Sequence, residues 1–204
     1  MFIKIPQFVL PVDETGFNDK AVLPYGLKID HIKYAMTDFC NFLSFINTEL
    51  QKNNMPIFEM FLMQANFSSI VGEFMNISIP KYCDALIKNK YHNGHPDLIE
   101  KGKFLNDSVQ HSYDGIEIKA SRYEKGWQGH NPENGWLMVF VFQSSRPNDA
   151  TSIPFYFKAV YGAELEESDW HFAGRNDGSR RTITATVKNS GFEKMSRNWI
   201  YKHP

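Results

Sequence analysis

The first half of the chain carries large apolar residues at helical spacing. They recur every three or four positions between Phe39 and Leu50, and Thr37 or Asp38 is a suitable N-cap for a helix that starts there. Similar reasoning predicts a second, longer helix or a broken pair of helices over residues 58–75, a third helix over residues 82–90, and one strand at residues 7–12 in an otherwise irregular segment 1–30.

The second half of the chain has the apolar patterns of β-strands. Residues 136–143 (WLMVFVFQ) are apolar on both faces, as expected of a buried central strand. Further strands are predicted at residues 115–121, 154–161 and 180–188, a short helix or loop at residues 164–170, and a closing helix or turn at residues 193–199. The predicted fold class is α/β or α+β, with a central mixed β-sheet flanked by helices. We expect one domain over residues 1–204, mostly helical over about 1–92 and sheet-rich over about 93–204.

Composition and charge narrow the function classes only a little. The chain has 204 residues, 42% of them hydrophobic, and 22 Lys and Arg against 23 Asp and Glu, so any surface that binds anions must be local. Cys40 and Cys83 fit no metal-ligand spacing and are expected to be buried free thiols. We find no signal peptide, no apolar run that could span a membrane and no nucleotide-binding loop. A cytoplasmic protein without a nucleotide cofactor is expected.

The candidate chemistry begins on the strand predicted at residues 115–121. Side chains alternate along a strand, so Glu117 and Lys119 share one face while Ile116 and Ile118 point into the core. A carboxylate and an ammonium therefore stand about 7 Å apart along the same face. This pairing of charges is the first indication of a site.

A second carboxylate precedes this strand. Asp97 follows Pro96, which restricts the backbone there, and the intervening residues are enough to bring Asp97 alongside Glu117. Two converging carboxylates suit Mg²⁺, and a neighbouring lysine can orient water or stabilise charge on a phosphate. Asp114 is an alternative first acid, with a turn residue as its simpler interpretation, and Asp107 is a weaker alternative.

Pro96-Asp97, a gap of nineteen residues and Glu117-Ile118-Lys119 together resemble the motif of the PD-(D/E)xK nucleases. The surrounding sequence, from about Gly72 to the C-terminus, also resembles bacterial proteins described as restriction endonucleases. The resemblance implies a restriction endonuclease-like core, in which a mixed sheet is flanked by helices. It further implies an acidic residue on an upstream helix, for which Glu73 is the best match and Glu59 the second choice.

The resemblance implies a Mg²⁺-dependent endonuclease, with Mn²⁺ as a substitute, that hydrolyses double-stranded DNA. Asp97 and Glu117 would bind the metal, Lys119 would position or activate water, and Glu73 would complete the acidic cluster. A homodimer is expected, because cutting both strands of a palindrome needs two active sites. The alternatives are a repair or resolving nuclease that reads DNA structure, and a non-catalytic DNA-binding or assembly protein.

Polar segments after the strand are candidates for contact with DNA. In residues 121–134 these are Gln128, His130 and Asn131, and in the segment 174–188 they are Arg175, Arg180 and Arg181. Further lysines near Pro96 and Asp97 could contact phosphates: Lys81, Lys88, Lys90, Lys101 and Lys103. His95 is either a supporting residue of the site or part of a turn. The histidines match no HExxH or HNH pattern, so zinc is not expected.

Overall fold

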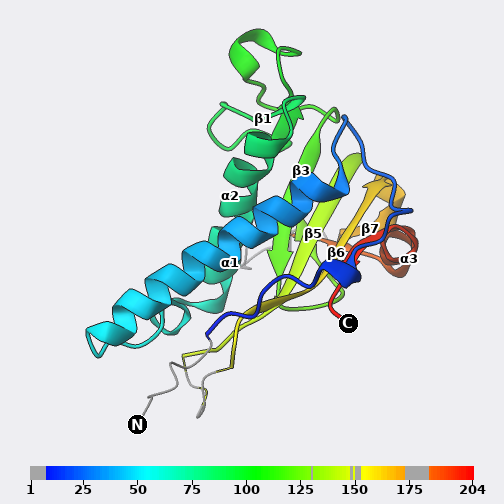
Figure 1. The fold of residues 1–204 in the computed structure, drawn as a ribbon. Helices are drawn as coiled ribbons and strands as arrows, with labels where there is room; N and C mark the ends of the chain where they lie inside the picture. The colour runs from blue at the N-terminus through cyan, green and yellow to red at the C-terminus, as the bar shows by residue number, and fades with distance from the viewer. Residues whose placement is uncertain (1–7, 130, 148, 150–152, 173–183) are drawn as a thin grey trace, which may run out of the picture.

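The computed structural model describes residues 8–129, 131–147, 149, 153–172 and 184–204. Within this part of the chain, three α-helices and two β-sheets form the fold (Figure 1). The helices are α1 (Ile29–Lys52), α2 (Gln64–Tyr82) and α3 (Asn189–Arg197). The strands are β1 (Leu86–Lys88), β2 (Leu98–Glu100), β3 (Ile116–Ser121), β4 (Gln128–Gly129), β5 (Gly135–Gln143), β6 (Tyr156–Leu165), β7 (Trp170–Phe172), β8 (Ala185–Val187) and β9 (Trp199–Lys202).

The main sheet has six strands in the order β1-β2-β3-β5-β6-β9. Strands β3 and β5 run parallel and the other neighbours are antiparallel, so the sheet is mixed. A second, antiparallel sheet has the order β4-β8-β7. The predicted class, a mixed sheet with helices, is therefore confirmed.

Helix α1 begins earlier than predicted, and the expectation that Thr37 or Asp38 caps it is wrong. The helix starts at Ile29 after Lys28, because the apolar stripe continues upstream through residues that are fully buried, including Ile32 and Met36. Thr37 instead donates a hydrogen bond to the Lys33 carbonyl inside the helix. The Asp38 carboxylate accepts hydrogen bonds from Ser78 and Tyr82, so it joins α1 to α2.

The predicted third helix at residues 82–90 is also wrong. Helix α2 ends at Tyr82, and the next residues form the edge strand β1, in which Ile87 pairs with Ile99 of β2. Pairing with β2 and burial of Leu86 in the core outweigh the local helical pattern, as tertiary context commonly does. Of the segment 58–75, residues Phe58–Phe61 form a short 3-10 helix and α2 begins at Gln64, so the interpretation as a broken pair holds.

The other predicted elements agree with the structure to differing degrees. Strands β3, β5 and β6 lie close to their predicted ranges, although β6 continues to Leu165 and a 3-10 helix follows at Glu167–Asp169. The closing helix forms earlier than expected, as α3. Strand β8 covers only part of residues 180–188, of which residues 180–183 lie outside the described residues. Near the N-terminus, Val9 makes an isolated bridge to Phe155.

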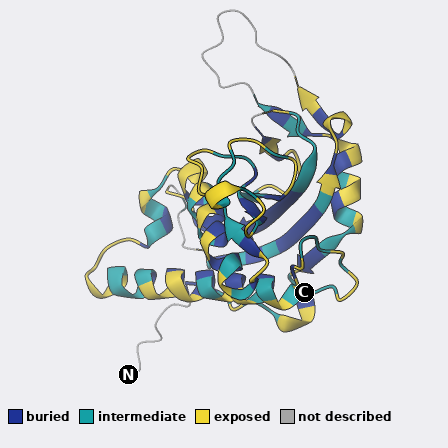
Figure 2. Cartoon of the chain, turned by 90° about the horizontal axis from the view of Figure 1, so that it is seen from above, coloured by how far each residue is buried: buried dark blue, intermediate teal, exposed yellow. Residues whose placement is uncertain are grey.

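The main sheet buries both of its faces, as Figure 2 shows by the dark blue along its central strands. Met138, Phe140 and Phe142 of β5 join the large core beneath α1 and α2. The alternating residues Val139 and Val141 join a second core formed with α3 and the small sheet. The continuous apolar run of β5 is therefore explained by burial on two sides.

Candidate active site

Strand pairing brings Asp97 next to the Glu117 and Lys119 pair. Leu98 of β2 is opposite Ile116 of β3, so the residue before β2 lies beside the start of β3. The Asp97 Oδ2 atom accepts a hydrogen bond of 2.8 Å from the backbone N–H of Ile118. The predicted meeting of this carboxylate with β3 therefore occurs in the folded chain.

Glycine at position 115 allows this approach. Gly115 has a φ of +151°, and a Cβ atom there would collide with the carbonyl oxygen of Leu98 and with the Pro96 ring. A larger residue would push β2 and the preceding Asp97 away from β3. The close packing of β2 on β3 therefore requires glycine at position 115, whatever the role of Asp114.

Glu117 and Lys119 point to the same side of β3, as the alternation predicted. Lys119 Nζ donates a hydrogen bond to Glu117 Oε1, and the two side chains are mostly buried, with 28% and 16% exposed. Burial lowers the pKa of Lys119, but the charges of Glu117 and Asp97 outweigh it and raise that pKa above its usual range. Lys119 therefore carries its positive charge at neutral pH.

Whereas the surroundings of Lys119 favour its charged form, those of Asp97 disfavour its charged form. Burial, and then the charge of Glu117, raise the pKa of Asp97 to about 7, although Lys119 and the hydrogen bond from Ile118 act in the other direction. A second negative charge beside Glu117 is therefore unfavourable in the protein alone. A site that disfavours its own carboxylate is suited to a cation that would neutralise it.

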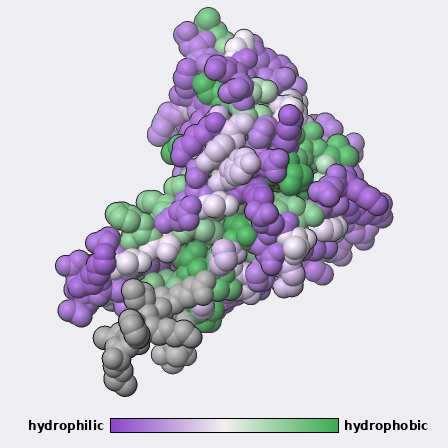
Figure 3. Space-filling model, viewed as in Figure 1, coloured by the Kyte–Doolittle hydropathy of each residue, from purple (hydrophilic) through white to green (hydrophobic). Residues whose placement is uncertain are grey.

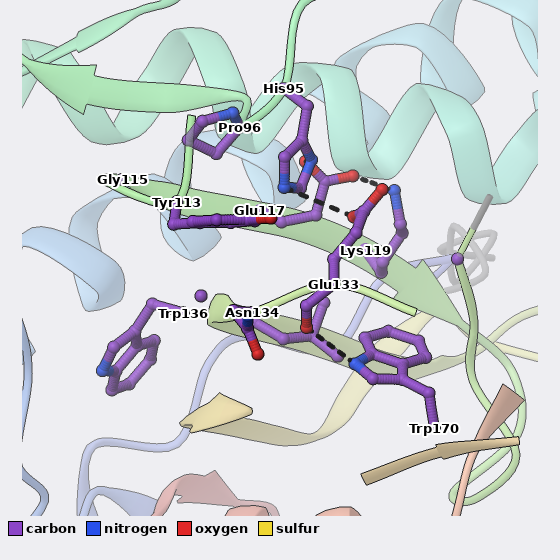
Figure 4. Close-up of a pocket in the computed structure, with 13 residues that line it drawn as sticks. His95, Pro96, Tyr113, Gly115, Glu117, Lys119, Glu133, Asn134, Trp136 and Trp170 are labelled. Atoms are coloured by element: carbon purple, nitrogen blue, oxygen red, sulfur yellow. Dashed lines mark hydrogen bonds and ion pairs between the residues drawn. The ribbon is translucent and has the colours of Figure 1, made fainter. Parts of the chain in front are cut away.

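His95 connects two carboxylates of this site (Figure 4). Its Nδ1 atom lies 3.0 Å from Glu117 Oε2, and its Nε2 atom lies 3.3 Å from Glu133 Oε2. Burial lowers the pKa of His95, but the hydrogen bond to Glu117 and the two carboxylate charges raise it overall. Burial alone would raise the pKa of Glu117, yet hydrogen bonding from His95 and the charge of Lys119 lower it to about 2.

These residues line one open groove, which we name the polar cleft. Its acidic residues are Glu73, Asp97, Glu117 and Glu133, and its other polar residues include Lys88, His95, His111, Lys119 and Asn131. A smaller cavity shares His95, Glu117, Lys119 and Glu133 with the cleft and continues toward Trp136 and Trp170. The surface around β1 and the neighbouring loops is mostly hydrophilic (Figure 3).

The two candidates for the upstream acid differ in position. Glu73 on α2 lines the polar cleft, where its carboxylate forms an ion pair of 2.6 Å with Lys88 of β1. Glu59 is buried and accepts a hydrogen bond of 2.9 Å from Asn47 of α1, which makes it part of the packing between α1 and the 3-10 helix. Position in the cleft therefore favours Glu73 over Glu59.

The alternative first acids lie apart from Glu117. Asp114 is exposed and forms an ion pair of 3.3 Å with Lys103. Asp107 pairs with Lys90 and accepts a hydrogen bond from the Gly102 backbone, so it stabilises its own loop. Asp97 is thus the aspartate that lies beside Glu117.

The predicted DNA-contacting residues are only partly placed. Asn131 lines the polar cleft, while Gln128 is an exposed residue of β4 opposite Thr186 of β8. The other four candidates lie outside the described residues: His130, Arg175, Arg180 and Arg181. Among the lysines, Lys88 and Lys90 line the cleft, where Lys88 pairs with Glu73 and Lys90 with Asp107.

Sequence reasoning missed Glu133 and His111. Glu133 lies in the segment before β5, and His111 in the segment before β3. Their ligand atoms lie with those of His95 in one group, all within 4.8 Å of one another. Neither residue is part of a recognisable spacing pattern, and the polar character of both segments was the only signal in the sequence.

Comparisons with protein-family models, with curated proteins and with solved structures find no significant match. Within the described part of the chain, no helix combines the length and the apolar character needed to cross a membrane. Both cysteines are buried free thiols, as predicted. A functional interpretation therefore depends on the residues of the polar cleft.

Proposed function

We propose that the protein is a Mg²⁺-dependent endodeoxyribonuclease that cuts double-stranded DNA at a specific site, in the manner of a type II restriction endonuclease with a PD-(D/E)xK motif. The observation that carries this proposal is the meeting of Asp97, Glu117 and Lys119 in one polar cleft. Their residue types and order along the chain are those of the motif. The proposal also includes a restriction endonuclease-like core for the mixed sheet.

The residues of the cleft suit a divalent cation. Asp97 and Glu117 would hold it, and Mn²⁺ would substitute for Mg²⁺, because both ions prefer oxygen ligands. The unfavourable charge of Asp97 beside Glu117 is the feature of the structure that fits such an ion. When bound, the cation supplies charge neutralisation and Lewis acidity toward the phosphodiester.

The chain's own residues have distinct parts in this proposal. Lys119 keeps its ammonium charged and would stabilise negative charge on the phosphate or orient a water molecule. Glu117 fixes that ammonium by accepting its hydrogen bond. Glu73 contributes negative charge from α2 at the edge of the cleft, and its partner Lys88 is available for a DNA phosphate.

The partners follow from the proposed substrate. Cutting both strands at a symmetric site needs two copies of the cleft, so we expect a homodimer on DNA. The protein would act in the cytoplasm, where its free thiols stay reduced. It would need no nucleotide cofactor.

Plasmid digestion tests the proposal directly. Purified protein is incubated with plasmid DNA in Mg²⁺, in Mn²⁺ or in EDTA, beside the variants Lys119→Ala and Lys20→Ala. We expect discrete fragments only with the metal ions, a loss of about 10²–10³-fold or more in Lys119→Ala, and no change in Lys20→Ala, which removes an exposed lysine elsewhere.

Other outcomes would favour other functions. If the protein cuts branched but not plain duplex DNA, a repair or resolving nuclease is the better proposal. If it binds DNA but cuts DNA from none of several sources, including methylated DNA, a non-catalytic DNA-binding or assembly protein is the better proposal. If cutting survives in Lys119→Ala, the site is wrongly placed or the activity belongs to a contaminant.

A further inference from the structure

His95 is oriented like a metal-binding histidine. Its Nδ1 atom is engaged by Glu117 Oε2 at 3.0 Å, which leaves Nε2 to face Glu133. Histidines that bind metals through one ring nitrogen commonly donate a hydrogen bond from the other to a carboxylate. That bond fixes both the tautomer and the orientation of the ring.

The backbone places a second imidazole beside the first. The His95 N–H donates to the Gln110 carbonyl at 3.0 Å, and the Ser112 N–H donates to the His95 carbonyl at 2.9 Å. This short parallel bridge pairs His95 with His111, and their ring centroids lie 5.4 Å apart. The proximity of the two rings thus results from paired backbone.

Glu133 supplies the third group from another part of the chain. Its backbone carbonyl accepts a hydrogen bond of 2.9 Å from the Trp170 indole, which anchors the segment before β5 to the small sheet. The Glu133 side chain is only 16% exposed and is directed toward His95 (Figure 4). A mostly buried carboxylate and two imidazoles therefore face one another.

The distances between the ligand atoms are close to those between atoms that bind one metal ion. The ligand atoms of the three residues lie within 4.8 Å of one another. Around Zn²⁺, with bonds of about 2.0–2.2 Å, such atoms stand roughly 3–4 Å apart. The exposed His111 side chain can close the difference by small rotations.

We propose that His95, His111 and Glu133 form a binding site for a borderline transition-metal ion such as Zn²⁺, with Glu117 as the carboxylate that orients His95. Two imidazoles and one carboxylate prefer such ions to Mg²⁺. The ion would join three segments of the chain at the wall of the polar cleft. Its three ligands differ from those proposed for Mg²⁺, although Glu117 lies beside both sites, and it does not require the protein to be a nuclease.

The test is a Co²⁺ titration of the full-length, tag-free and metal-free protein, followed by visible absorption. Co²⁺ is the probe because its d–d bands report nitrogen and oxygen ligands, and Zn²⁺ is added afterwards to displace it. We expect one Co²⁺ per chain. Because even the loss of an outer-shell partner typically weakens binding by 10–100-fold, we expect His111→Ala to weaken it by at least about tenfold.

Two variants separate this site from its surroundings. His92→Ala removes an exposed histidine of the same cleft and should leave Co²⁺ binding unchanged. Asp97→Asn alters the site proposed for Mg²⁺ and should also leave Co²⁺ bound. Circular dichroism is used to check that each variant is folded.

Three results would overturn the inference. Wild-type protein that binds no Co²⁺ would leave His95 as a simple bridge between carboxylates. If His92→Ala and His111→Ala weaken Co²⁺ binding equally, His111 is not a ligand of the ion. Binding lost in Asp97→Asn but kept in His111→Ala would place the ion with Asp97 and Glu117, which would support the proposed function while refuting this site. A failure to cut DNA has no bearing on any of these measurements.

Discussion

Asp97 is a second carboxylate beside a pair of charges that are already matched. Glu117 contacts the Lys119 ammonium and lies 3.0 Å from His95 Nδ1, so its negative charge already has partners. The Asp97 carboxylate adds one further negative charge, and its pKa is raised accordingly. A residue that is unfavourable for folding yet placed in a cleft is typical of functional sites.

We therefore expect Asp97→Asn to stabilise the metal-free protein while it abolishes the proposed cleavage. The gain is on the order of 3–4 kcal/mol at pH 7, because each unit by which the pKa lies above about 3.9 corresponds to about 1.4 kcal/mol, and Tm should rise by roughly 10 °C. Because the folded-state pKa of Asp97 is about 7 and its unfolded value is near 3.9, wild-type stability falls as pH rises between these values. The difference in the free energy of unfolding between wild type and Asp97→Asn should vanish near pH 4 and reach its full size above pH 7.

Thermal unfolding at several pH values, in EDTA, measures this effect. Asp114→Asn is the matched control, since Asp114 is an exposed aspartate with one surface ion pair, and it should change Tm little. An Asp97→Asn protein less stable than wild type at pH 7 would show that the carboxylate is well accommodated after all.

One buried carboxylate adds polar contacts to the apolar packing of helix α3. Asp169 accepts hydrogen bonds from Lys194 Nζ at 2.6 Å, from Ser190 Oγ at 2.9 Å and from the Glu166 N–H at 3.1 Å. Burial raises the pKa of Asp169, but these bonds outweigh it and lower the pKa below its usual range. Two of the three partners belong to α3, so the carboxylate holds that helix beside β7.

Replacing Asp169 by asparagine should destabilise the protein by about 1–3 kcal/mol at pH 7, because an amide cannot satisfy the same donors. The lowered pKa means that this stabilisation is present above the unfolded value near 3.9 and is lost as pH falls through the folded value. Urea unfolding at pH 7 and below pH 4 measures the change. Glu167→Gln, at an exposed neighbour, should unfold like wild type, and an equal loss in both variants would contradict the role of Asp169.

Two hydrophobic cores pack against opposite faces of the main sheet. Successive residues of β5, such as Phe140 and Val141, enter opposite cores, and β6 alternates in the same way with Val160 and Tyr161. Neither core can lose its packing without disturbing strands that the other needs. We infer that the described part of the chain unfolds cooperatively.

A single unfolding transition is therefore expected. Met138→Ala in the large core and Val141→Ala in the second core should each lower stability, by about 2–5 kcal/mol for the methionine. Each variant should still give coincident curves by circular dichroism and by tryptophan fluorescence, which reports Trp127, Trp170 and Trp199 at the second core and Trp136 at the large core. Separate transitions in Val141→Ala would show that the second core unfolds independently.

The local pattern of apolar and polar residues was sufficient to predict the central strands of the main sheet. The alternation of Glu117 and Lys119 with Ile116 and Ile118 predicted β3 and the shared direction of the two charges, and the apolar run of β5 predicted a central strand. The position of Asp97 beside them was also expected, because a motif resemblance joined residues that are distant in the sequence. The inferences on β3 and β5 depend on side-chain patterns within a single strand, whereas the position of Asp97 was expected from the motif.

Only the tertiary structure decided features that depend on contacts between elements. Leu86 belongs to a strand because β2 is available to pair with that segment, although the local pattern indicated a helix. His95, His111 and Glu133 come together through a backbone bridge and a hydrogen bond from Trp170, which no spacing in the sequence records. Such contacts are set by the packing of the whole chain, so they become visible only when the segments that carry them are placed in space.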